Sequence, residues 1–403
     1  MPEQKTVGLV IAGAAARGAY EAGALSVLIP ELDRQDKRPT VMVGSSAGGI
    51  NAFLLAQYSD LAADEAVQKI VDVWARIELS NVLSPILPAA LGTGVLSLAE
   101  FLAIPGVRLK SLFDTAPLRA TVEQFFEADR LHRNIQEGRV RALALAATAP
   151  NGRTTVFVEA TAGVRPPEPD NERAIDYVAS TIAPEHVLAS AAIPLLFPPI
   201  WVEHPAGWYR DGLVRLNAPI KPALALGAEQ LALVASEPDT YPSATPGPAK
   251  DEEPDIEDAG AQLLHAVLAD HMVEDILTFH TINQLVDQLA GQLGKPRSDV
   301  HIKKKNGHSY QFVDSIFAGP HEPGLLGNAA EAYYEKHYGN GWKFLSTFTL
   351  LGRLLGNNSE SRGELLSWLF FEPKFLQKII KMGQDDAEQR LKAARDSKSF
   401  PFN

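Results

Sequence analysis

The residues best suited to chemistry lie in the pentapeptide Gly44-Ser45-Ser46-Ala47-Gly48. An apolar run precedes it at residues 40–43, and a helical pattern follows from residue 49. A serine at a tight turn between strand and helix is typical of a nucleophile elbow, where the glycines avoid backbone clashes. The first N–H groups of the helix would lie beside the Ser46 hydroxyl and favour negative charge there. The pattern predicts nucleophilic acyl transfer, with a plain glycine- and serine-rich turn as the alternative.

A second loop of small residues follows the first apolar strand, residues 7–11, and reads Ala12-Gly13-Ala14-Ala15-Ala16-Arg17-Gly18. Adjacent parallel strands would place this loop beside Ser46, so its N–H groups are candidates for stabilising an oxyanion. A phosphate-binding dinucleotide loop is the rival interpretation. The glycine spacing is only a degraded form of that fingerprint, and the second strand ends in the serine elbow instead of an acid. We therefore favour the oxyanion interpretation.

Acyl transfer by a serine also needs a base. An ordinary α/β-hydrolase has a histidine late in the chain, after an acid. None of the ten histidines of this chain stands in such a motif. Several lie on helical patterns, which indicate surface or packing roles. The elbow also follows only the second strand, which is too early for that fold. Asp211, in Trp208-Tyr209-Arg210-Asp211-Gly212, is the better candidate, although an Asp-Gly pair alone indicates a turn.

Further motifs stand in a recognisable order around Asp211. Upstream lies Ala189-Ser190-Ala191-Ala192-Ile193-Pro194 with Phe197-Pro198-Pro199, and Asn217 and Pro219 follow downstream. With the loop ending in Arg17-Gly18, the G-x-S-x-G elbow and the segment 111–118, this order resembles the patatin-like phospholipase family. The resemblance covers roughly residues 6–235, and the C-terminal part is similar to extensions of bacterial members.

The resemblance implies a serine–aspartate dyad in place of a triad, with Ser46 as nucleophile and Asp211 as its base. The oxyanion hole would comprise Gly13, Ala14 and Ala15, with Arg17 helping to hold the loop. The supporting motif residues would be Gly18, Gly44, Gly48, Gly212 and Asn217. The resemblance implies neither a metal nor a cofactor.

Two positions depart from the family pattern. The donor loop is usually a run of glycines, whereas Ala14 stands in it here, and Leu213 follows Asp-Gly where glycine or alanine is more usual. If the loop needed a positive φ at position 14, an alanine there would strain the oxyanion hole. Leu213 would either narrow the pocket or face the core.

A dyad makes a demand on the carboxylate, because an unperturbed aspartate with a pKa of about 3.9 is a poor base for a hydroxyl. Burial in apolar surroundings raises the pKa of a carboxyl group. We expect Ile193, Phe197, Trp208 and Tyr209 to supply such surroundings for Asp211. The hypothesis is that Asp211 titrates above its reference value.

The strands and helices that must position these residues are predicted to form an α/β fold. Residues 7–11 and 40–43 are continuous apolar strands on either side of a helix, which implies a parallel sheet covered on both faces. Further strands are expected at residues 141–147, 154–158 and 230–234. We expect a three-layer fold with a mainly parallel central sheet flanked by helices, followed by a C-terminal helical extension.

The chain divides by composition into three parts. Residues 6–235 would be the catalytic domain, with residues 79–109 as a candidate lid, a lipid-facing insertion or a loop-rich segment packed on the core. Residues 236–260 are rich in proline and acids and predict a linker or loop. Residues 261–403 predict a mainly helical extension. Apolar residues between 342 and 355 could form an interfacial surface or pack on the main domain.

Composition excludes several function classes. The chain of 403 residues is 46% hydrophobic, has no cysteine and carries a net charge of −12. The charge argues against nucleic acid as a partner, and the lack of cysteine excludes thiolate chemistry. No signal peptide or membrane-spanning stretch is recognisable, so we expect a cytoplasmic protein, peripheral at a membrane at most.

We therefore expect a serine hydrolase that cleaves fatty-acyl esters of phospholipids or lysophospholipids through an acyl-serine intermediate. A general carboxylesterase, a thioesterase or an acyltransferase with the same dyad is the enzymatic alternative. A catalytically impaired interaction scaffold, suggested by the alanine in the donor loop, is the alternative from another class.

Overall fold

The architecture is that of a computed structural model, which describes residues 5–85, 111, 113–194, 196–216, 218–239, 271–303, 309–338 and 359–403. Asn217, residues 86–109 of the expected insertion, residues 240–260 of the expected linker and the apolar residues between 342 and 355 lie outside these ranges. The expected division into a catalytic domain, linker and extension stays a prediction.

The described residues form a nine-stranded sheet in which seven strands follow the order β13-β10-β1-β2-β5-β6-β7. The strands from β13 to β5 are mutually parallel, and β6 is antiparallel to β5. The hairpin β8–β9 joins through β9, which pairs with the end of β5. The strands are β1 (Val7–Ile11), β2 (Val41–Ser45), β5 (Ala142–Thr148), β6 (Thr154–Ala160), β7 (Ile175–Ala179), β8 (Ile200–Glu203), β9 (Ala206–Asp211), β10 (Gln230–Val234) and β13 (Asp314–Ala318).

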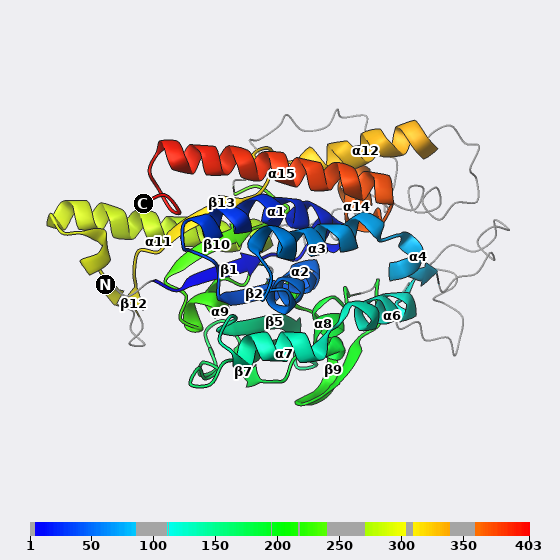
Figure 1. Ribbon diagram of the computed structural model, residues 1–403, viewed down its shortest axis with the longest axis horizontal. Helices are drawn as coiled ribbons and strands as arrows, with labels where there is room; N and C mark the ends of the chain where they lie inside the picture. The colour runs from blue at the N-terminus through cyan, green and yellow to red at the C-terminus, as the bar shows by residue number, and fades with distance from the viewer. Residues whose placement is uncertain are drawn as a thin grey trace, which may run out of the picture.

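Helices cover both faces of the sheet, which confirms the expected α/β fold (Figure 1). On one face pack α1 (Gly18–Arg34), α2 (Ser46–Gln57), α3 (Ala63–Arg76), α7 (Ala128–Gln136), α8 (Pro184–Ser190) and α15 (Pro373–Asp396). On the other pack α9 (Ile220–Ala225) and α11 (His271–Leu293). The remaining elements are α4 (Leu79–Val82), β3 (Ser84–Pro85), β4 (Phe113–Asp114), α6 (Ala116–Phe125), β11 (Ile302–Lys303), β12 (Ser309–Tyr310), α12 (Leu325–Tyr338) and α14 (Ser359–Leu369).

The C-terminal part of the chain is integrated with this sheet. Its strand β13, which the sequence did not predict, pairs in parallel with β10. Its helix α15 runs along α1 (Figure 1). The two helices approach closely because each has a glycine at the crossing: a Cβ on Gly23 would lie 2.0 Å from the Ile380 carbonyl oxygen, and one on Gly383 would lie 2.0 Å from that of Tyr20. The helix that follows the donor loop is therefore held from outside by the C-terminal helix.

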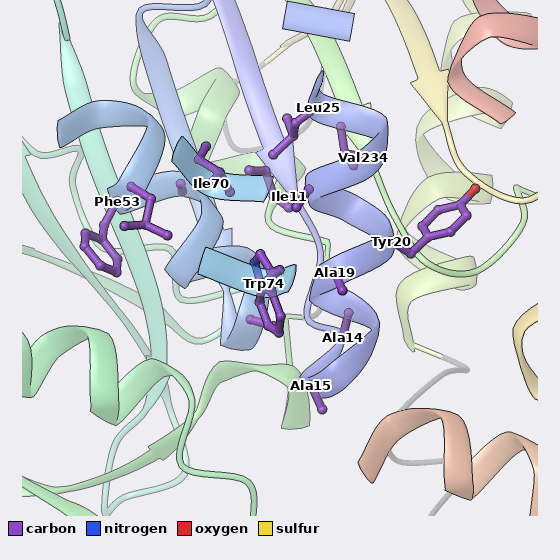
Figure 2. Close-up of a cluster of buried hydrophobic side chains, with 14 of the residues drawn as sticks. Ile11, Ala14, Ala15, Ala19, Tyr20, Leu25, Phe53, Ile70, Trp74 and Val234 are labelled. Carbon is purple, nitrogen blue, oxygen red and sulfur yellow. The ribbon is translucent and has the colours of Figure 1, made fainter. Parts of the chain in front are cut away.

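The larger core cluster surrounds the start of α1. Ile11, Ala14 and Ala15 lead from β1 into the helix, and Trp74 of α3 packs against this turn (Figure 2). All four side chains are buried. The donor loop is thus part of the core, which limits its freedom to move.

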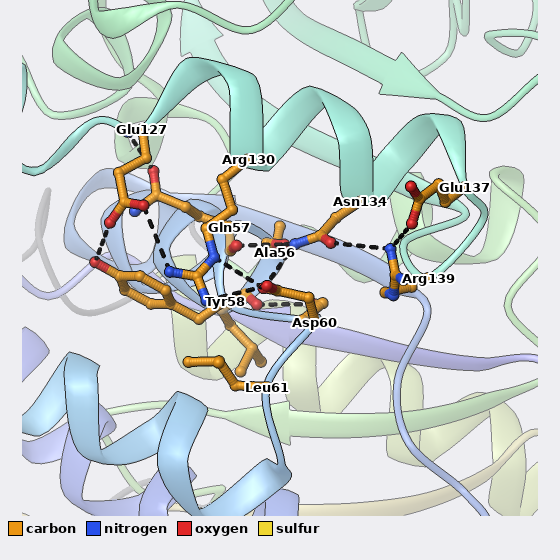
Figure 3. Close-up of polar contacts among 12 residues, drawn as sticks. Ala56, Gln57, Tyr58, Asp60, Leu61, Glu127, Arg130, Asn134, Glu137 and Arg139 are labelled. Atoms are coloured by element: carbon orange, nitrogen blue, oxygen red, sulfur yellow. Dashed lines mark hydrogen bonds and ion pairs between the residues drawn. The ribbon is translucent and has the colours of Figure 1, made fainter.

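The C-terminal end of α2 is fixed by polar contacts with α7 (Figure 3). Asn134 donates from Nδ2 to the carbonyl oxygens of Ala56 (3.1 Å) and Gln57 (2.8 Å), which satisfies carbonyls that the helix end leaves unpaired. Arg130 pairs with Asp60 just beyond the helix. These contacts anchor α2 at the end opposite Ser46.

Candidate active site

Ser46 lies at the junction of β2 and α2, in the strand–turn–helix arrangement that the sequence predicted. Its φ of 55° is in the left-handed region, which is strained for a non-glycine residue and typical of functional turns. A Cβ on Gly44 would lie 2.3 Å from the Gly48 carbonyl oxygen, and one on Gly48 would lie 2.2 Å from that of Ala12. Both positions therefore require glycine, one to close the turn and the other to bring the donor loop against it.

The elbow is also held by Ser190, the last residue of α8. The Ser46 backbone N–H donates to Ser190 Oγ at 3.1 Å, and Ser190 Oγ donates to the Ala146 carbonyl oxygen at 2.7 Å. Ser190 is completely buried. In the sequence Ser190 is recognisable only as part of a motif, and no local signal there indicates this bridge between the elbow and β5.

Asp211 ends β9 and is fixed through its backbone. It pairs with Ala147 of β5, its N–H donates to the Ala192 carbonyl oxygen at 2.9 Å, and its own carbonyl oxygen accepts from Thr148 Oγ1 at 2.8 Å. The carboxylate Oδ1 accepts from the Leu213 N–H at 2.9 Å. The aspartate therefore has little freedom to turn away from the elbow.

Burial raises the pKa of Asp211 to about 7, while the Leu213 N–H and the Ser46 hydroxyl act in the opposite direction. The shift has the direction that the sequence analysis expected. A carboxyl group that titrates near neutrality is a far better proton acceptor for a hydroxyl than an ordinary aspartate. The raised pKa is the shift that a carboxyl group needs if it is to act as a general base.

The structure brings Ser46 and Asp211 together, since the serine hydroxyl contributes to the pKa of the aspartate. Both residues are at most 1% exposed. Among the described residues, neither Ser46 Oγ nor Asp211 Oδ2 has a hydrogen-bond partner of normal geometry. Eight other buried side-chain atoms of the described residues share this feature, so it is the closeness of the two residues that sets this pair apart.

The donor loop lies beside the elbow, and Ala15 lines the same cavity as Ser46. The backbone strain of this loop lies at Ala15 and not at Ala14, the position whose alanine departs from the family pattern. Ala14 has φ −148°, which suits any residue, whereas Ala15 has φ 45°. An alanine at position 14 is therefore not strained. The backbone strain of a left-handed conformation lies at position 15 instead.

Arg17 points away from the cavity into the C-terminal part of the chain. It pairs with Glu237 and with Glu364 of α14, and its Nε donates to Ser367 Oγ at 2.8 Å. The arginine is 1% exposed, and its guanidinium lies over the Trp368 ring. It holds the donor loop through partners more than 200 residues away in the sequence.

A cavity of about 60 Å³ opens from Ser46. Its walls come from α2, α3, α4 and α6, together with Ala191, Ile193, Phe197 and Phe371, and nearly all of its lining is hydrocarbon. Trp74, Phe125 and Phe197 are among the lining residues. An apolar cavity beside a serine hydroxyl suits the hydrocarbon next to a reacting ester carbonyl.

Comparison with known proteins decides the family. The model of the patatin-like phospholipase family matches residues 9–224, more than half of the chain. The chain belongs to that family. A search of the curated proteins finds no match. Among solved structures, VipD from Legionella pneumophila aligns with a TM-score of 0.35 and 14% identity, over 97% of this chain and 67% of that one.

Members of the patatin-like phospholipase family are typically serine lipid hydrolases, so membership indicates lipid acyl hydrolysis and a lipid substrate. No helix among the described residues is long and apolar enough to cross a membrane.

Two other positions in this member of the family can now be placed, Leu213 and His186. Leu213 is fully buried in the main core cluster, so it faces the core. No histidine is among the described residues that line the Ser46 cavity. His186, on α8, instead packs edge-on against Phe157 and accepts the Ala183 N–H at 3.0 Å.

The expected role of Trp208 was wrong. Ile193, Phe197 and Tyr209 are buried as expected, but Trp208 is 54% exposed and does not surround Asp211. Side chains alternate along β9, so the inward positions of Tyr209 and Asp211 force Trp208 outward.

Proposed function

We propose that this protein hydrolyses fatty-acyl esters of phospholipids or lysophospholipids, with Ser46 as nucleophile and Asp211 as general base. The observation that carries the proposal is Ser46 at a strained turn on the wall of an apolar cavity, with the buried carboxyl group of Asp211 near enough for the serine hydroxyl to act on its pKa. Family membership supplies the reaction class.

In the first half of the reaction, Ser46 Oγ attacks the ester carbonyl carbon while its proton passes to Asp211. The oxyanion of the tetrahedral intermediate is stabilised by N–H groups of the loop from Gly13 to Ala15 and by the N-terminal end of α2. The intermediate collapses, the proton of Asp211 moves to the leaving alcohol oxygen, and an acyl-serine remains.

In the second half, water attacks the acyl carbon and gives a proton to Asp211. Collapse of the second intermediate releases the fatty acid and returns the proton to Ser46. The apolar residues around the cavity bind the acyl chain and keep the carboxyl group of Asp211 away from bulk water, which maintains its raised pKa.

Fatty-acid release from a panel of phospholipids, lysophospholipids, triacylglycerols and acyl-thioesters tests this proposal. We expect release from one or both phospholipid classes, and a loss of at least about 1,000-fold in Ser46→Ala and Asp211→Asn. Release that survives in both variants would refute the dyad, and a clear preference for thioesters would refute the substrate class. Circular dichroism and thermal unfolding of both variants serve as the folding control.

A further inference from the structure

The hairpin β8–β9 carries an exposed pair of tryptophans beside the candidate active site. Trp201 of β8 and Trp208 of β9 are cross-strand partners, and their rings meet edge to face with centroids 5.4 Å apart. Their residues are 41% and 54% exposed. Two large aromatic side chains held together on an outer face form an unusual surface for a soluble domain.

The hairpin presents this pair on a rigid support. Its inner face places Ile200, Val202 and Tyr209 in the core, and the Tyr209 ring packs edge-on against Phe157. In Figure 1 the hairpin extends beyond α8 at the lower edge of the view. The tryptophans are therefore preorganised, and little conformational freedom would be lost when they bind.

The hairpin adjoins the site, because α8, which holds the Ser46 elbow, packs on both β8 and β9, and Asp211 ends β9. Phe197 lines the cavity of Ser46, and Trp201 follows it by four residues. Trp208 precedes Asp211 by three residues on the same strand. A lipid that enters the cavity must come from the surface on which it resides, so the same surface would meet this hairpin.

The outer face of the hairpin also has the chemistry of a membrane interface. Trp201 donates its indole N–H to the Glu203 carboxylate at 2.8 Å, which fixes the orientation of the ring on this face. Arg210 lies on the same face of β9 as Trp208 and is partly exposed. Indole rings favour the headgroup level of a bilayer, and a guanidinium binds phosphate oxygens.

We propose that the face formed by Trp201, Trp208 and Arg210 docks this protein onto a phospholipid bilayer and brings the cavity of Ser46 to the lipid surface. This inference rests on the proposed function for its choice of partner. Because the chain carries a net charge of −12, apolar insertion supplies most of the affinity and Arg210 adds a smaller contribution on anionic vesicles.

The test measures cosedimentation of the full chain with phosphatidylcholine vesicles, in the Ser46→Ala background so that the lipid stays intact. We expect Trp201→Ala/Trp208→Ala to lower the partition coefficient at least about tenfold, with little dependence on salt. The matched control is Leu285→Ala/Leu293→Ala, which removes two side chains of similar exposure (51% and 54%) from α11 and should change nothing. Arg210→Gln should weaken binding about fivefold on vesicles that contain phosphatidylserine.

A second readout separates this inference from the proposed function. In the chain that keeps Ser46, the double tryptophan variant should release fatty acid from vesicles at least about tenfold more slowly than the parent chain. It should still hydrolyse a soluble short-chain ester at a rate within about twofold of the parent rate. Vesicle binding remains measurable even if no substrate is hydrolysed. Undiminished vesicle binding by the double variant would overturn the proposal. So would loss of a homodimer in that variant with vesicle binding retained, because the face would then bind a second copy of the chain.

Discussion

The Ser190 hydroxyl accepts a hydrogen bond from the backbone N–H of Ser46 at 3.1 Å and donates one to the Ala146 carbonyl oxygen at 2.7 Å. Two residues further on, the carbonyl oxygen of Ala192 accepts the backbone N–H of Asp211 at 2.9 Å. The turn that ends α8 thus contacts both members of the proposed dyad. It fixes the separation between the attacking hydroxyl and the carboxylate.

Ser190→Ala should lower kcat about 10- to 100-fold with little change in KM. Loss of the hydroxyl leaves the Ser46 N–H buried without a partner, and small displacements of a nucleophile have large kinetic effects. Steady-state kinetics on a soluble ester measure the split. Ser180→Ala is the control, because that hydroxyl donates at 3.3 Å to the Val178 carbonyl oxygen, away from the elbow. A kcat within about twofold of the parent in Ser190→Ala would contradict the positioning role.

The rate should depend on pH through Asp211. The carboxyl group must be ionised to accept the serine proton, and burial raises its pKa to about 7. Because the ionised form is the active one, kcat/KM should rise as the pH increases through about 7 and level off above it. This rise can be measured as the acidic limb of a pH profile of ester hydrolysis between pH 5 and 9, about two units on each side of the pKa.

Asp275 offers a control for that assignment, because burial raises its pKa to about 7 as well. It lies on α11, on the other face of the sheet from α2. Asp275→Asn should leave the limb near pH 7 in place. A limb that disappears in Asp275→Asn, or that lies near pH 4 in the parent chain, would show that Asp211 is not the titrating base.

Ala15→Gly should stabilise the protein by about 0.5–1 kcal/mol, because glycine relieves the left-handed conformation at φ 45°. Ala14→Gly is the matched control: Ala14 has φ −148°, so glycine there only adds freedom to the unfolded chain and should destabilise it by a similar amount. Urea unfolding measures both. Changes of the same sign in the two variants would contradict the placement of strain at Ala15.

Glu364→Gln should destabilise the protein by about 2–4 kcal/mol and lower kcat, because it leaves the buried Arg17 guanidinium with only one carboxylate. The control is Glu335→Gln, which removes a 58% exposed partner of Arg362 and should cost less than about 1 kcal/mol. Equal changes in the two variants, measured by urea unfolding and by steady-state kinetics, would show that Arg17 does not couple α14 to the donor loop.

The parts of the site that the sequence predicted are local. The elbow is a strand, a glycine turn and a helix within 17 consecutive residues, so its pattern can be recognised without knowledge of the fold. Asp211 could be predicted only from the order of the motifs around it, because an Asp-Gly pair by itself indicates no more than a turn. The exposed position of Trp208 could also have been predicted, since alternation along the strand follows once Asp211 faces inward.

The missed parts depend on contacts between distant segments. Nothing near Arg17 in the sequence indicates that Glu237 and Glu364 neutralise it, and nothing near Ser190 indicates that it accepts from Ser46. The strand Asp314–Ala318 was missed because a five-residue run has little periodicity, and its place beside β10 depends on the whole sheet.

The central claim is that Ser46 is an activated nucleophile, and labelling by a fluorophosphonate probe followed by intact-protein and peptide mass spectrometry tests it most directly. We predict one adduct per chain, located on Ser46, that forms at least about 100-fold more slowly in Asp211→Asn. The absence of an adduct on folded protein, or labelling of Ser46→Ala at the parent rate, would contradict the account.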